Sequence, residues 1–321
     1  MILESKGTPN LVSDIINNNS NDIKNCIKNK STFVLNINES TDNYNLVADV
    51  KINFTFGDRY NANMNYKECL NSNFKNCIIN INYPISYELP LVFKSISHEL
   101  THLYELYQIK DKFDKTRWKW QDALNNTIKQ QKLGSDVVYF RDMLYLSLPQ
   151  ELNARVSSIY TYLSMKSKSG ISKDDLIKIL EGTNEWLNYL NLLNFSPDQL
   201  TFGLINNFKD DMNFLYFIFN ELNTSLNIDY KIENIEDIKS YLSKVNKMFK
   251  NSANKYKNKL LRVVDRVYEE NNKKLEYITY DPGNIDYEEY IKEDKQKIRS
   301  KKLEILLEYS DFIKEISKYD N

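Results

Sequence analysis

The chain has 321 residues, 41% of them hydrophobic, and a formal net charge of −1 at pH 7. This length and apolar content can build one large domain or two smaller ones. The balanced charge gives no electrostatic reason to expect binding to nucleic acid or to an anionic membrane. Only seven residues are glycine, which argues against glycine-rich nucleotide-binding loops and favours a mostly helical protein.

The sequence shows neither a targeting signal nor a disulfide pattern. The stretch MILESKGTPN lacks the basic and apolar segments of a signal peptide, and no window of about 18 apolar residues predicts a membrane span. The three cysteines, Cys26, Cys69 and Cys77, are odd in number and lack CxxC spacing. We therefore expect reduced thiols and a cytoplasmic protein.

The N-terminal third alternates between helix and strand patterns. Residues 11–27 form a short amphipathic helix candidate, and residues 31–57 contain two stretches rich in β-branched residues, which predict two strands. Residues 77–84 alternate isoleucine and asparagine before Pro84. This alternation predicts a further strand with one buried face and one polar face.

A helix predicted from residue 89 to residue 110 carries the only two histidines of the chain. His98 and His102 are four residues apart, and Glu99 follows the first, which gives the pattern HExxH. Residues with this spacing share one helical face, so both imidazoles can bind one metal ion, for which we expect zinc. The apolar side of the helix consists of Ile96, Leu100, Leu103 and Tyr107. Because it lies opposite the histidines, we expect them to face an open cleft.

Helical periodicity dominates the rest of the chain. Further helices are predicted over residues 116–133, 137–146, 172–193, 197–222, 235–272 and 287–318. Another helix is predicted to begin at Ser147-Leu148-Pro149-Gln150, which has the pattern of a capping box with Ser147 as the N-cap. This helix carries Glu151 and Arg155 on a face next to its apolar stripe.

Two histidines need a third protein ligand to form a catalytic zinc site. No other histidine exists in the sequence, so this ligand is a carboxylate or a cysteine. Glu151 is our first candidate, and Asp142 is the second. Glu105 shares the histidine face but lies two turns beyond His98, so it is better placed as an acceptor that orients His102, or as a solvated charge.

His98–His102 together with Glu151–Arg155 resembles the gluzincin-like zincins, in particular the minimal zincins of bacteria and phages. The resemblance covers roughly residues 45–165. The chain departs from the best-known members by a longer interval before the glutamate and by lacking their NExxSD pattern. The resemblance implies a metallopeptidase that binds one Zn²⁺ per chain through His98, His102 and Glu151, and acts on a peptide or protein. Glu99 would be the general base for the attacking water.

The same resemblance implies a donor that stabilises the oxyanion, and the nearest candidates are Arg155, Tyr160 and Tyr162. It also implies a mainly helical α+β fold. In it a small N-terminal β-sheet packs on the HExxH helix and on a glutamate helix. We expect a catalytic domain over residues 1–168, with its core at about 31–165, and a helical C-terminal region over residues 169–321.

A second interpretation is a non-enzymatic structural or assembly protein, for example of a phage particle, that keeps a zincin fold and a structural zinc. Its basis is the long helical remainder, which no minimal peptidase requires. In either case the C-terminal helices are candidates for binding a protein partner. A phage-encoded protein would act in the virion or in the host cytoplasm. Glu99 favours the enzyme, because a structural zinc needs no general base.

Overall fold

The computed structural model describes residues 8–41, 44–110, 135–167, 170–225 and 230–279. The chain divides into two units, residues 1–273 and 274–321. Of the second unit, only residues 274–279, the end of a long helix, are described. The helices expected over residues 116–133 and 287–318 lie outside the described residues. The domain boundary expected at residue 168 stays a prediction.

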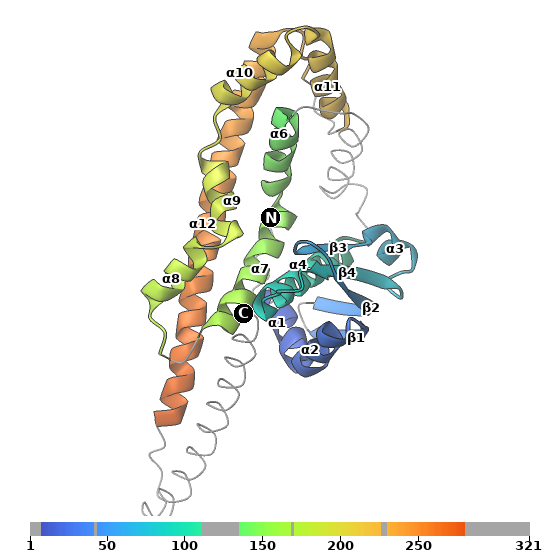
Figure 1. Cartoon of the computed structure of the whole chain (residues 1–321), viewed down its shortest axis with the longest axis vertical. Helices are drawn as coiled ribbons and strands as arrows, with labels where there is room; N and C mark the ends of the chain where they lie inside the picture. The colour runs from blue at the N-terminus through green and yellow to red at the C-terminus, as the bar shows by residue number, and fades with distance from the viewer. Residues whose placement is uncertain (1–7, 42–43, 111–134, 168–169, 226–229, 280–321) are drawn as a thin grey trace, which may run out of the picture. The chain divides into compact units, whose positions relative to one another are not determined.

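The fold is α+β and mainly helical, as predicted, with one four-stranded mixed sheet near the N-terminus (Figure 1). The order of strands in the sheet is β1-β2-β4-β3. β2 pairs antiparallel with β1 and parallel with β4, and β3 pairs antiparallel with β4. The strands are β1 (Thr32–Thr41), β2 (Tyr44–Phe56), β3 (Asn61–Met64) and β4 (Cys77–Tyr83).

Helices precede, interrupt and follow the sheet. The predicted N-terminal helix is two helices that meet at Asn19, and a short helix lies between β3 and β4. The helix that carries both histidines follows β4. These helices are α1 (Thr8–Asn18), α2 (Ser20–Asn29), α3 (Tyr66–Asn71) and α4 (Leu89–Ile109).

The rest of the described chain is helical. Two of the long predicted helices are each broken in two, the first at Gly182-Thr183 and the second at residues 209–211. None of the described helices is long and apolar enough to cross a membrane. The helices are α6 (Ser135–Leu146), α7 (Pro149–Lys166), α8 (Lys173–Glu181), α9 (Asn184–Leu193), α10 (Pro197–Phe208), α11 (Met212–Ser225) and α12 (Ile235–Thr279).

The buried apolar residues form two clusters. The first, here called the sheet core, includes residues from Leu11 to Leu106 and combines the strands with α1, α2 and α4. The second, here called the helical core, includes residues from Val137 to Val267 and contains helices alone. α4 therefore belongs to the sheet core, whereas α7 contributes Leu152, Ile159 and Leu163 to the helical core.

The face of the sheet opposite the core carries a row of hydrogen-bonded polar side chains. Thr32 Oγ1 donates to Asn53 Oδ1 over 2.8 Å, and Asn53 Nδ2 donates to Asn80 Oδ1 over 3.0 Å. Asn80 Nδ2 then donates to Asn63 Oδ1 over 3.3 Å. The row thus crosses all four strands, and β4 has the buried and polar faces that its isoleucine–asparagine alternation predicted.

Candidate metal centre

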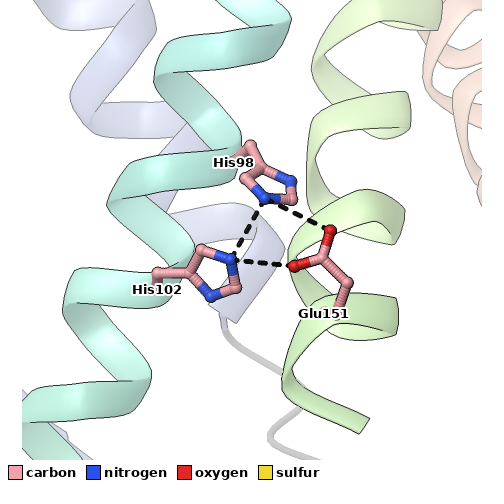
Figure 2. Close-up of side chains that lie close together, drawn as sticks. All are labelled: His98, His102 and Glu151. Carbon is pink, nitrogen blue, oxygen red and sulfur yellow. Dashed lines mark hydrogen bonds and ion pairs between the residues drawn. The ribbon is translucent and has the colours of Figure 1, made fainter. Parts of the chain in front are cut away.

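α4 is fixed by its apolar side, which packs into the sheet core. Pro90 lies in the first turn, where its missing N–H costs no intrahelical hydrogen bond. Ile96, Leu100 and Leu103 are each at most 2% exposed. This packing leaves the opposite side of α4 facing α7, and both histidines lie on that side (Figure 2).

Small polar residues allow α7 to lie close against α4. Ser97 Oγ is 3.4 Å from Ser157 Oγ, and Thr161 Oγ1 donates to Ser97 Oγ over 3.0 Å. Ala154, one turn after Glu151, is fully buried. Short side chains keep the two backbones near each other, which brings Glu151 within reach of the histidines.

α7 begins where the sequence predicted, but its cap differs. The N-cap residue is Leu148, which has no side-chain hydrogen bond to the helix, so the predicted capping box is wrong. The Ser147 hydroxyl donates instead to the carbonyl of Leu144, over 2.7 Å, and so satisfies the end of α6. Pro149 in the first turn of α7 still marks its beginning.

His98, His102 and Glu151 converge on one point between α4 and α7 (Figure 2). The Nε2 atoms of the two histidines are 3.1 Å apart. Glu151 Oε2 is 3.4 Å from His102 Nε2, and Glu151 Oε1 is 3.6 Å from His98 Nε2. The Nε2 atoms of both histidines and both carboxylate oxygens of Glu151 thus point at the same small space.

The three side chains are more enclosed than the periodicity of α4 predicted. His102 is 6% exposed and Glu151 is 1% exposed, while His98 is partly exposed. Helix periodicity showed which side of α4 is polar, but it could not show that α7 covers that side. The expected open cleft is therefore a buried cluster that reaches the surface near His98.

Burial and neighbouring charges set the ionisation of the cluster. Burial lowers the pKa of His98 to about 3, although Glu151 opposes the shift. Burial alone would raise the pKa of Glu151, but Arg155 and the two histidines outweigh it and hold this pKa well below its usual range. Burial alone would lower the pKa of His102, but the hydrogen bond and charge of Glu151 outweigh it and raise this pKa. His98 and Glu151 are thus in the forms that bind a metal, whereas a cation would take the place of a proton on His102.

Glu99 lies beside the cluster but outside the ligand set. It is 6% exposed, and it interacts electrostatically with His102 and Glu151. Burial raises its pKa to about 7, and the charge of Glu151 acts in the same direction. A carboxyl group with this pKa can both accept and return a proton near neutral pH.

Two charged side chains, Arg155 and Glu105, lie next to the candidate ligands without belonging to the ligand set. Arg155 Nε lies 2.7 Å from Glu151 Oε1. Glu105 Oε2 lies 4.0 Å from His102 Nδ1, and its other oxygen accepts a hydrogen bond from Asn153 Nδ2 over 3.0 Å. Glu105 is thus near the side of His102 away from Glu151, at ion-pair distance, and its role in orienting the imidazole stays a prediction.

The donor set fits a zinc ion. Two imidazole nitrogens and one carboxylate are the protein ligands of many catalytic zinc sites, and metal–ligand bonds of about 2.0–2.2 Å in a tetrahedron separate the ligand atoms by about 3.3–3.6 Å. With one ligand atom taken from each residue, the three atoms of the cluster all lie within 4.8 Å of one another, so one ion can bind all three after small side-chain shifts. Both oxygens of Glu151 are buried: Oε1 lies 2.7 Å from Arg155 Nε, and Oε2 lies 3.4 Å from His102 Nε2. A cation bound between Oε2 and the imidazoles would compensate the charge of this oxygen.

The other residues singled out by the sequence lie apart from the three ligands. Asp142 is exposed and pairs with Arg141 over 2.7 Å. The Tyr160 hydroxyl donates to Glu270 over 2.7 Å, with the guanidinium of Arg266 over its ring. Tyr162 lies beside Lys94 and Lys166. Of the three proposed oxyanion donors, Arg155 therefore contacts a ligand directly.

Tyr145, at the end of α6, is a site residue that sequence reasoning missed. Burial raises its pKa well above the usual value, and the charges of Glu151 and Glu99 raise it further. Its hydroxyl therefore lies near both the third ligand and the candidate base. One tyrosine among 23 carries no sequence signal, because its position depends on how α6 packs beside α4 and α7.

No family model, no curated protein and no solved structure matches the chain. The site is therefore defined by its own geometry: a buried His-His-Glu group that can hold one metal ion, with a buried glutamate next to it.

Proposed function

We propose that the protein is a zinc-dependent metallopeptidase. The observation that carries this proposal is Glu99, a buried carboxyl group between the two histidines in sequence and beside the ligand cluster in space. A structural metal site needs only its ligands, whereas hydrolysis also needs a base that is close to the metal but does not bind it.

A zinc ion held by His98, His102 and Glu151 would supply a Lewis acid that makes a water more acidic and polarises a peptide carbonyl. Glu99 accepts a proton from the attacking water as the water oxygen bonds to the carbonyl carbon. The same carboxyl group then gives this proton to the amide nitrogen as the C–N bond breaks. The products are a carboxylic acid and an amine, and Glu99 returns to its starting state.

Tyr145 is the candidate donor for the oxyanion. Its hydroxyl lies near Glu151 and Glu99, and its raised pKa keeps it protonated at neutral pH. A protonated hydroxyl can donate to a developing negative charge in a site from which water is largely excluded. We place Tyr145 in this role beside the donor expected from the sequence, Arg155, whose Nε already lies against Glu151.

β3 supports a peptide as substrate. It is an edge strand of the sheet, it packs near α4, and its residues are exposed or partly exposed. The free edge of a strand can pair with an extended peptide through main-chain hydrogen bonds. Such pairing would suit a substrate recognised largely by its backbone.

The test combines metal analysis with a cleavage assay. We expect about one zinc per chain and cleavage within a peptide library. Glu99→Gln should keep the zinc and lower kcat by about 10²- to 10⁴-fold, because the amide cannot accept the proton. Glu181→Gln, a change at an exposed glutamate of α8, is the matched control and should cleave like the wild type.

A wild-type protein without bound metal would overturn the proposal. One equivalent of zinc without cleavage of any peptide would favour the second candidate, a structural or assembly protein with a structural zinc. The enclosure of the site supports that candidate, since Glu151 is 1% exposed and structural zinc sites are closed. Against it, structural sites have four protein ligands, and the group in the described part of the chain has three.

A further inference from the structure

Glu185, far from the HExxH helix in sequence, is a buried charge that the proposed chemistry does not use. It lies in the first turn of α9 and is 3% exposed. Lys94 of α4 donates to its Oε2 over 2.5 Å. On the other side, Arg155 Nη1 lies 3.9 Å from its Oε1. A carboxylate is rarely buried this deeply unless its partners compensate its charge.

Arg155 connects Glu185 to the ligand cluster. Its Nε lies 2.7 Å from Glu151 Oε1, so the guanidinium contacts Glu151 directly and forms a longer ion pair with Glu185. This contact occupies Oε1 and leaves Oε2, which is 3.4 Å from His102 Nε2, as the oxygen best placed for a cation. Arg155 thereby fixes the orientation of the third ligand.

The same contact has an electrostatic disadvantage. A guanidinium is positively charged at all ordinary pH values, and it repels a cation bound to the carboxylate that it touches. Little water is present to screen this repulsion, because Glu151 and the nearby Tyr256 are both almost fully buried. An arginine can therefore serve beside this site only if another negative charge balances it.

We propose that Glu185 is a positioning residue of the metal centre. Together with Glu151 it balances the charges of Lys94 and Arg155, so that Arg155 can orient Glu151 without weakening the binding of a cation. α9 is then part of the metal site although it supplies no ligand. This inference rests on the metal site of the proposed function, but not on peptidase activity.

The test is a double-mutant cycle in the full chain, read out as zinc affinity by competition with a chelator. Glu185→Gln keeps the shape of the side chain and removes its charge, and it should weaken zinc binding by about 10-fold, the lower end of the range for direct partners of metal ligands, because Glu185 acts through Arg155. Glu185→Asp should recover part of this loss. Glu181→Gln should have no effect.

The double variant separates electrostatics from packing. If Glu185 acts through the charge of Arg155, Glu185→Gln should change zinc affinity less than about twofold when Arg155→Gln is already present. If Glu185→Gln alone does not fold, the zinc affinities of Arg155→Gln and the double variant can still be compared. The absorption spectrum of the Co²⁺ form should shift in Glu185→Gln, because the orientation of Glu151 changes.

Two results would overturn the inference while leaving the metal site intact. One is unchanged zinc affinity in Glu185→Gln together with a lower melting temperature of the metal-free protein, which would make the contact purely structural. The other is an equal loss of affinity with and without Arg155. Failure of the wild type to bind zinc would instead remove the metal site itself.

Discussion

The sheet core and the helical core each hold one of the two helices that form the candidate metal centre. The sheet core fixes α4 through strands and helices together, and the helical core fixes α7 through helices alone. Buried polar side chains concentrate where these two helices face each other, among them Ser97, Glu99, Thr101, His102, Glu151, Ser157 and Thr161. Elsewhere both cores are largely apolar.

This difference indicates how the site is assembled. Buried polar groups are costly unless they find partners, so a concentration of them on one pair of helices marks a functional surface. α4 supplies two ligands and the base, whereas α7 supplies the third ligand. Neither core holds the complete donor set, and we therefore expect metal binding to require that both are folded and packed together.

The largest expected effect comes from removing the only ligand of the helical core. Glu151→Ala should weaken zinc binding by more than about 100-fold, since even partners of metal ligands cost about 10- to 100-fold when they are changed. Competition with a chelator measures this. Asp142→Ala, which removes an exposed carboxylate on the neighbouring helix, is the control. If Asp142→Ala lost the zinc and Glu151→Ala kept it, the ligand assignment would be reversed.

Tyr145 tests whether the helical core contributes to catalysis beyond a ligand. Tyr145→Phe should keep zinc affinity and lower kcat by about 100-fold, because one donor to the oxyanion is lost. Steady-state kinetics on a cleaved peptide measures the effect, and Tyr139→Phe, at an exposed tyrosine of the same helix, is the control. An unchanged kcat would leave Arg155, Tyr160 and Tyr162 as the candidates.

A smaller effect is expected from widening the contact between α4 and α7. Ser97 is fully buried and contacts Ser157 and Thr161, so Ser97→Leu should lower the free energy of unfolding by about 1–3 kcal/mol through overpacking. Urea unfolding measures this, and zinc affinity should fall as Glu151 moves away from the histidines. Ser95→Leu, a change on the same helix at a partly buried serine, should cost less. Equal costs would mean that close packing of α4 and α7 is not specific to Ser97.

Local pattern predicted three of the four strands and the histidine helix, but it missed β3 and α3. The alternation in residues 77–84 and the periodicity of residues 89–110 correspond to β4 and α4 almost residue by residue. The choice of Glu151 agrees with the cluster, although the capping box that supported it does not form. Of the predicted signals at the beginning of α7, Pro149 in the first turn is the one that the structure confirms.

The sequence did not predict which residues of distant helices would lie near the metal ligands. Glu185 is 34 residues beyond Glu151 and Tyr145 is on another helix, so neither shares a motif or a periodicity with the ligands. The breaks at Gly182-Thr183 and residues 209–211 were also missed, because the flanking helices keep apolar positions at helical spacing. Tertiary packing decides these features, and a single sequence records them only weakly.

A row of hydrogen-bonded side chains across the sheet helps to fix the position of α4. It consists of Thr32, Asn53, Asn80 and Asn63. Each hydrogen bond joins residues that are opposite each other in register, so a slip of β4 by one residue would break the row and turn its asparagines into the sheet core. Only residues 84–88 separate β4 from α4. An error in register would therefore displace His98 and His102 along the sheet. Polar side chains on the outer face of the sheet thus help to set where the two imidazoles lie.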